Sequence, residues 1–288
     1  MWVAYSLFFA FWTSIGILIL KRLTPNFKPA SLTLIGNLFT IPCMLILILV
    51  LFQIPQTTIE FYKLILISAV FDSIAAITYF KALTISPISL ISPISSFNPI
   101  FTLIFASIFL NENPTPIKLL GIVVIVLGSY LLNLSSIKKG LLKPLTDLFS
   151  NRGVQLFLVA NLIWGLTPIF QKQAIFETTP QVPLFAALIG GVIVSILIFP
   201  LAFKEKVYRV PIKKYSKWFL ILGPMTALAT LAAFTAFTLT NVAYVTAIFK
   251  LSTLFTVILG AVFLHEKRIK ERFLGAAVMV AGTILIAI

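Results

Sequence analysis

The sequence predicts an all-α integral membrane protein, in which ten transmembrane helices form two inverted five-helix repeats around a central cavity. Two observations support this fold class. Of the 288 residues, 60% are hydrophobic and only 10% are charged, whereas a soluble domain carries about 25% charged residues. In addition, the second half of the chain repeats the pattern of the first. Repeated membrane units are typical of proteins that hold a binding site between the two units.

The repeat is clearest in two pairs of segments. Gly121-Ile-Val-Val-Ile-Val-Leu-Gly128 is matched 154 positions later by Gly275-Ala-Ala-Val-Met-Val-Ala-Gly282. The same offset carries Glu112, after an apolar run, onto Glu266. Near the start of each half, Trp12 matches Trp164 at an offset of 152. We therefore expect a first repeat over residues 1–137, a cytoplasmic connector over 138–153 and a second repeat over 154–288.

Ten apolar runs are long enough to span a membrane, which takes roughly 20 residues per helix. They cover about 2–20, 30–52, 62–81, 87–110, 116–134, 154–174, 182–203, 218–239, 243–264 and 272–288. All should be helical, because lipid offers no partner for free backbone groups.

The basic residues predict the orientation. The side that carries the first loop has 18 Lys and Arg, and the other side has 3. The positive-inside rule places the basic side in the cytoplasm, so both termini face outward across the cell (inner) membrane. The loop after Glu112 is poor in basic residues and its partner after Glu266 is rich in them. Such opposite bias is expected of inverted repeats.

Composition also excludes several kinds of protein. One Cys and one His leave no disulfide within the chain and no Cys or His metal cluster. The net charge is +14, but the basic residues lie beside the apolar runs, where they set the orientation of the chain in the membrane. We therefore expect no nucleic-acid partner. No phosphate-binding loop of the G-x-x-x-x-G-K-[ST] type is present. Clustered catalytic groups are also missing, and we expect neither an enzyme nor a cofactor.

Lys250 is the most informative single residue. It lies within the ninth apolar run, roughly 10 Å from its outer end. A charge near the bilayer centre costs about 2.5–3.5 kcal/mol on insertion scales, so it should face protein or water. Thr246 and Thr253 share its helix face. The group is interpreted as a contact for an anionic or zwitterionic ligand. The alternatives are a structural ion pair and snorkelling to the outer headgroups.

Asp72 lies at a comparable depth in the third run, roughly 16 Å from the outer end. It could pair with Lys250, bind the substrate or carry a coupling proton. The alternative is a local structural role, in which Asp72 only bonds Ser73 or a neighbouring helix end.

The fourth run is interrupted by Pro93 and Pro99, which remove backbone donors. Broken helices persist at membrane depth where they line a cavity. Ser92, Ser96 and Asn98 are therefore candidate binding residues, although serine also serves helix packing.

Three weaker features remain. Asn161 and Trp164 in the sixth run either line the pocket or, for the Trp, anchor the helix at the interface. Glu112 is expected to cap a helix or to pair at a helix junction. The glycine pairs Gly121/Gly128 and Gly275/Gly282 should let helices approach closely, within one chain or between two chains of a homodimer.

The chain resembles the EamA-like family of the drug/metabolite transporter superfamily. The resemblance rests on an ordered set of short motifs: Tyr79-Phe-Lys-Ala-Leu83, Asn98-Pro-Ile-Phe-Thr102, Leu110-Asn-Glu112, the run from Lys250 to Lys267, Gly275 and Gly282. It implies a cavity lined mainly by spans 1, 3, 4, 6, 8 and 9, with spans 5 and 10 at the periphery. Some relatives carry a span-nine lysine that meets an anionic group of the substrate. Their termini are mostly cytoplasmic, whereas the charge count predicts the reverse here.

The sequence thus predicts a secondary transporter that moves a small polar metabolite, amino-acid-like or an organic anion, by alternating access. The alternative is a lipid-carrier flippase on the same fold, which would open sideways to the bilayer.

Overall fold

The computed structural model describes residues 1–23, 26–86, 92–134, 145–146, 150–264 and 269–288. In the first half lie α1 (Trp2–Leu23), α2 (Pro29–Leu51), α3 (Ile59–Ile85), the 3₁₀ helix η2 (Ser92–Phe97), α5 (Asn98–Phe109) and α6 (Pro116–Leu134). In the second half lie α8 (Arg152–Phe176), α9 (Pro183–Lys204), the 3₁₀ helix η3 (Val207–Arg209), α10 (Ile212–Leu239), α11 (Val242–Phe249), α12 (Leu251–Leu264) and α13 (Ile269–Ala287). Two-residue strands β1 (Gln56–Thr57) and β2 (Thr178–Thr179) pair with each other.

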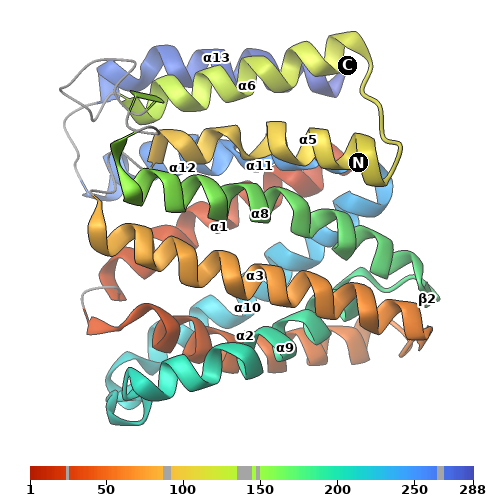
Figure 1. The fold of residues 1–288 in the computed structure, drawn as a ribbon, viewed down its shortest axis with the longest axis vertical. Helices are drawn as coiled ribbons and strands as arrows, with labels where there is room; N and C mark the ends of the chain where they lie inside the picture. The colour runs from red at the N-terminus through yellow and green to blue at the C-terminus, as the bar shows by residue number, and fades with distance from the viewer. Residues whose placement is uncertain (24–25, 87–91, 135–144, 147–149, 265–268) are drawn as a thin grey trace.

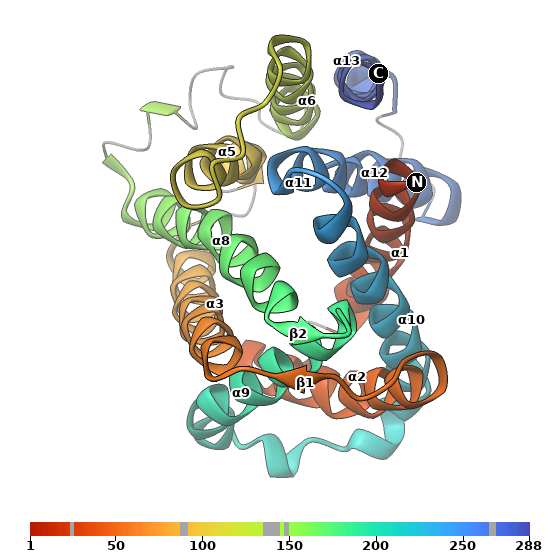
Figure 2. The same ribbon diagram turned by 90° about the vertical axis from the view of Figure 1, so that its right-hand side faces the viewer.

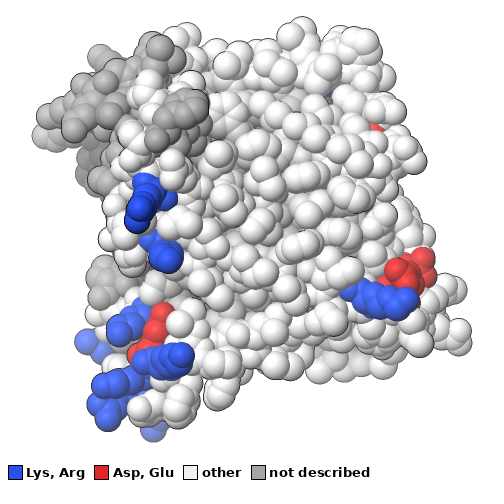
Figure 3. Space-filling model, in the orientation of Figure 1, with Lys and Arg blue, Asp and Glu red and all other residues white. Residues whose placement is uncertain are grey.

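This architecture confirms an all-α membrane protein. Within the described residues, seven helices are long and apolar enough to cross a bilayer, and three shorter apolar helices cover 93–109, 116–132 and 274–287. The helices run side by side, and both ends of the chain lie at one end of the bundle (Figure 1). A broad uncharged surface separates Lys and Arg at one end from a small mixed cluster at the other (Figure 3). Such an uncharged band suits the hydrocarbon core.

Helices of the first half pack mainly against helices of the second. The extensive contacts join α6 to α13, α3 to α8, α1 to α10 and α2 to α9. Viewed end-on, α6 and α13 stand together outside the remaining helices (Figure 2). The strand pair β1–β2 and the hydrogen bond from the Thr58 hydroxyl to Glu177 also link the halves. The two repeats therefore build one interlocked bundle.

The four motif glycines bring α6 and α13 into backbone contact. A Cβ added at Gly121 would lie 2.9 Å from the Gly282 carbonyl oxygen, and one added at Gly282 would lie 2.8 Å from the Gly121 oxygen. Gly128 and Gly275 meet in the same reciprocal way, at 2.8 Å for each. These faces are therefore used for packing within the chain, which resolves the choice left open by the sequence for this motif.

Both spans that correspond under the 154-residue offset are interrupted. In the first half, the 3₁₀ helix η2 gives way to α5 at Asn98, with Pro99 in its first turn. In the second, Lys250 separates α11 from α12: its N–H bonds the Ala247 oxygen at 3.1 Å, and its own carbonyl accepts from the Thr253 N–H at 3.0 Å. The prolines predicted the first interruption. The second was not expected, because we treated 243–264 as one continuous helix.

Candidate functional site

A cavity of about 340 Å³ lies beside the two helix interruptions. It is lined by α1, α5, α8, α10, α11 and α12 through Phe9, Asn98, Pro168, Gln171, Thr230, Ala233, Phe234, Phe237, Thr246, Phe249, Lys250, Ser252 and Thr253. We call it the Lys250 cavity. Four phenylalanines make most of its wall apolar, and Lys250 is the one charged lining residue among those that the structure describes. An apolar pocket with a few convergent polar groups is the usual form of a small-molecule site.

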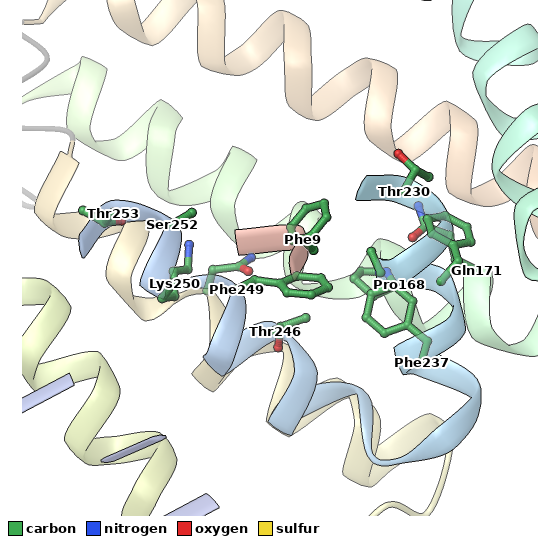
Figure 4. Close-up of a pocket in the computed structure, with 13 residues that line it drawn as sticks. Phe9, Pro168, Gln171, Thr230, Phe237, Thr246, Phe249, Lys250, Ser252 and Thr253 are labelled. Carbon is green, nitrogen blue, oxygen red and sulfur yellow. The ribbon is translucent and has the colours of Figure 1, made fainter. Parts of the chain in front are cut away.

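Lys250 projects into this cavity from the turn between α11 and α12 (Figure 4). The side-chain ion pairs of the described residues are Lys63–Glu60 and Lys172–Glu112, and neither includes Lys250. In the part of the chain that the structure describes, this ammonium group thus faces a cavity without an acidic partner within 4 Å. Of the three interpretations raised by the sequence, this placement favours a ligand contact over a structural ion pair or snorkelling.

The polar groups around Lys250 come from both interrupted spans. Asn98 and Ser252 occupy equivalent positions at the 154-residue offset, each just after its interruption, and both line the Lys250 cavity. Thr246 and Thr253 line it as well, as their shared helix face predicted. The Thr246 hydroxyl donates to the Ala243 carbonyl at 3.2 Å, and the Asn98 amide nitrogen donates to the Asn161 carbonyl at 3.1 Å. These bonds hold the two side chains in fixed directions.

Asp72 lines a second, neighbouring cavity of about 280 Å³, here called the Asp72 cavity. Its walls come from α2, α3, α8, α9 and α10: Thr33, Asn37, Met44, Ile65, Ser68, Ala69, Asp72, Trp164, Gln171, Ala186, Ala187, Gly190, Gly191, Val194, Thr230 and Phe234. Gln171, Thr230 and Phe234 line both cavities. Asp72 and Lys250 are not paired in the structure; they belong to adjoining spaces.

Gln171 connects the two cavities chemically. Its side-chain nitrogen lies 3.2 Å from the Asp72 carboxylate and 3.2 Å from the Ser68 hydroxyl oxygen. Figure 4 shows it at the other end of the Lys250 cavity from Lys250. Sequence reasoning missed this residue, as it missed the aromatic wall. A glutamine within the apolar run 154–174 was the available signal.

Two sequence candidates, Ser96 and Asn161, have other surroundings. Ser96 is fully buried, and its hydroxyl lies 2.8 Å from that of Ser129 in α6, so it lines neither cavity. The buried Asn161 donates from its side chain to the Ile94 carbonyl at 2.8 Å and supports the backbone of η2. Ser92 begins η2, and its side chain lies outside the described residues. Trp164 does line the Asp72 cavity, with its ring 5.4 Å from that of Tyr79.

A buried polar cluster adjoins Gln171 at the end of the bundle that holds the chain termini. The Lys172 ammonium lies 2.6 Å from a Glu112 oxygen and 2.7 Å from the Thr240 carbonyl. The other Glu112 oxygen accepts from the Val242 N–H at 2.8 Å, at the start of α11. A carboxylate at a helix N-terminus is stabilised by the helix dipole. Glu112 thus both caps and pairs, as the sequence predicted, and Lys172 is largely buried.

Known proteins resemble this chain in sequence pattern and in fold. The family model described as the EamA-like transporter family matches residues 1–134 and 151–288. No curated protein matches the chain. Of the solved structures, 27 chains match. One of them, described only as a "Crystal structure of protein", is 13% identical, with a TM-score of 0.76 over 100% of this chain and 98% of that chain. That likeness concerns the fold alone.

Proposed function

Because the chain belongs to the EamA-like transporter family, we propose that it is a secondary transporter for a small polar metabolite that carries a carboxylate or phosphate group. The observation that carries the proposal is Lys250, an ammonium group facing a cavity with no acidic partner among the described residues. An anionic group bound there would form a charge-assisted hydrogen bond, which is shorter and stronger than a neutral one. Asn98, Ser252, Thr246 and Thr253 would contact the rest of the ligand.

The proposed architecture is ten spans in two inverted halves, 1–137 and 154–288. Three relationships support it. The glycine contacts between α6 and α13 are reciprocal, and the helix interruptions occupy corresponding positions. In addition, α1 corresponds to α8 and α3 to α10, so the packing of α1 on α10 has its counterpart in that of α3 on α8. Such reciprocity is what a pseudo-two-fold axis in the membrane plane produces.

The proposed mechanism is alternating access at the Lys250 cavity. The two interruptions would let the half-helices α5 and α12 change direction relative to η2 and α11 while most backbone hydrogen bonds stay intact. Short turns at the ends of rigid elements commonly absorb such motions. The basic end of the bundle would face the cytoplasm and both termini would face outward across the cytoplasmic membrane.

Asp72 would supply the second charge of the transport cycle. An ionised carboxylate at membrane depth needs compensation, and the residues lining its cavity include no Lys or Arg. Two species could supply the positive charge: a coupling proton or a cationic group of the substrate. Proton coupling predicts that an imposed pH gradient drives uptake by the wild type and no longer drives uptake by Asp72→Asn. The cationic group is treated in the next subsection.

The transport function is tested in proteoliposomes with a panel of carboxylate and phosphate metabolites. We expect Lys250→Ala to lower transport of the best substrate by at least about tenfold, because a hydrogen bond to a charged group contributes about 1.5–3 kcal/mol. Lys63→Ala is the matched control, since Lys63 forms an exposed ion pair with Glu60. Unchanged transport by Lys250→Ala would contradict the proposed site. Movement of a labelled lipid carrier, without uptake of soluble metabolites, would favour the flippase instead.

A further inference from the structure

The Asp72 cavity differs from the Lys250 cavity in the sign of its charged lining residue and in the size of the side chains that form its wall. Among the described residues, its lining includes one carboxylate, that of Asp72, and four polar side chains, Ser68, Asn37, Thr33 and Thr230. The carboxylate accepts hydrogen bonds from Gln171 and Thr167. A carboxylate can accept about four such bonds, so acceptor capacity remains for a further donor. The chemistry of this cavity therefore suits a cation with several N–H donors.

The remaining wall of the Asp72 cavity is apolar and small. Ala186, Ala187, Gly190 and Gly191 line it from α9. A Cβ added at Gly190 would come no closer than 3.9 Å to a neighbouring atom, and one at Gly191 no closer than 3.7 Å. A bare metal ion would need several oxygen ligands close together, whereas this side of the cavity offers only open space beside small apolar residues. It accommodates a short hydrocarbon segment next to the carboxylate.

The geometry points to a second subsite in the Asp72 cavity for a primary ammonium group, so that the substrate carries its anion and its ammonium at opposite ends of an apolar linker. This inference rests on the proposed transport function. The two cavities adjoin at Gln171, Thr230 and Phe234, along which the linker would lie. Among the described residues Lys250 and Asp72 form no ion pair, so neither side chain blocks the other and each faces its own cavity, open to a separate group of the ligand.

The test uses the full chain in lipid nanodiscs and straight-chain ω-amino acids with two to six methylene groups. Each is compared with the carboxylate of equal length that lacks the amine and with the amine that lacks the carboxylate. We expect one ω-amino acid to bind the wild type at least about tenfold more tightly than both analogues, since each end adds a charged hydrogen bond. Binding is measured by titration calorimetry.

Two substitutions locate the effect. Asp72→Asn keeps the side-chain shape and should abolish the preference for the ω-amino acid over its carboxylate analogue, while the affinity for the carboxylate is unchanged. Gly190→Leu fills the Asp72 cavity without removing a charge. It should weaken the binding of the ω-amino acid but leave the binding of its carboxylate analogue unchanged. Glu60→Gln, which removes an exposed carboxylate from the same helix α3, should change neither affinity.

The inference is overturned if no ω-amino acid binds the wild type more tightly than its carboxylate analogue, or if Asp72→Asn leaves the preference intact. The proposed transport function is judged separately by Lys250→Ala. If the second subsite fails by these criteria, a loss of carboxylate binding in Lys250→Ala would still leave the proposed function standing. Unchanged binding in both Lys250→Ala and Asp72→Asn would remove both.

Discussion

The Lys172 ammonium lies 2.6 Å from Glu112, and the two side chains are only 10% and 12% exposed. This pair joins the end of α8 to the segment after α5, while Glu112 also caps α11. Three elements are thus tied at the bundle end that carries the chain termini. By contrast, the Lys63–Glu60 pair has 62% and 52% of its side-chain surface exposed.

Glu112→Gln should therefore destabilise the protein far more than Glu60→Gln. The amide retains an oxygen for the Val242 N–H but leaves the Lys172 charge buried without its counter-ion. Breaking a buried pair costs about 3–5 kcal/mol, whereas an exposed pair is worth about 0–1 kcal/mol. Thermal unfolding of the two variants in the same detergent measures the difference. Equal melting temperatures would show that the buried pair does not stabilise the fold.

Gly282→Ala should weaken the packing of α13 on α6. Its Cβ would lie 2.8 Å from the Gly121 carbonyl oxygen, a backbone atom that cannot move aside without shifting the helix. Overpacking of this kind costs about 1–3 kcal/mol. Gly36→Ala is the matched control, because no atom lies within 4 Å of a Cβ added there. A melting temperature for Gly282→Ala as high as that of Gly36→Ala would contradict the close contact.

Asn161→Ala should lower stability without removing a ligand contact. The Asn161 side chain satisfies the Ile94 carbonyl inside the 3₁₀ helix η2, and a buried unsatisfied polar group costs about 1–3 kcal/mol. Asn161 lines neither cavity. We expect a reduced melting temperature together with substrate affinity within about twofold of the wild type. A large loss of affinity in a variant of normal stability would instead place Asn161 in the binding site.

The proposed orientation predicts the behaviour of reporters fused to the chain. A C-terminal fusion to a reporter that is active only in the cytoplasm should be silent, and a fusion within the basic segment around η3 should be active. The segment around η3 is rich in Lys and Arg, and the positive-inside rule places such a segment in the cytoplasm. A bright C-terminal reporter would reverse the orientation.

The sequence predicted the helices, and it marked Lys250 as a candidate because a lone charge in an apolar run is rare and costly. It did not predict the turn at Lys250, because no proline or glycine marks that position. Ser96 was placed on the face of an α-helix. Residues 92–97 instead form a 3₁₀ helix with about three residues per turn, so side chains point in other directions. The Asp72 cavity is formed by helices that are far apart in the sequence. The spacing of residues within one apolar run cannot show which other helices lie beside it.

The interlocked halves have a consequence for biosynthesis. Since α1, α2, α3 and α6 each find their main neighbour beyond residue 150, these helices are synthesised before those neighbours exist. At about 5–20 residues per second, translation of the missing half takes on the order of 7–30 s. During that interval the bare helix faces are exposed to lipid or to the insertion machinery. A chain that stopped midway would be unable to mature on its own, so the speed of translation through the second half is expected to affect the yield.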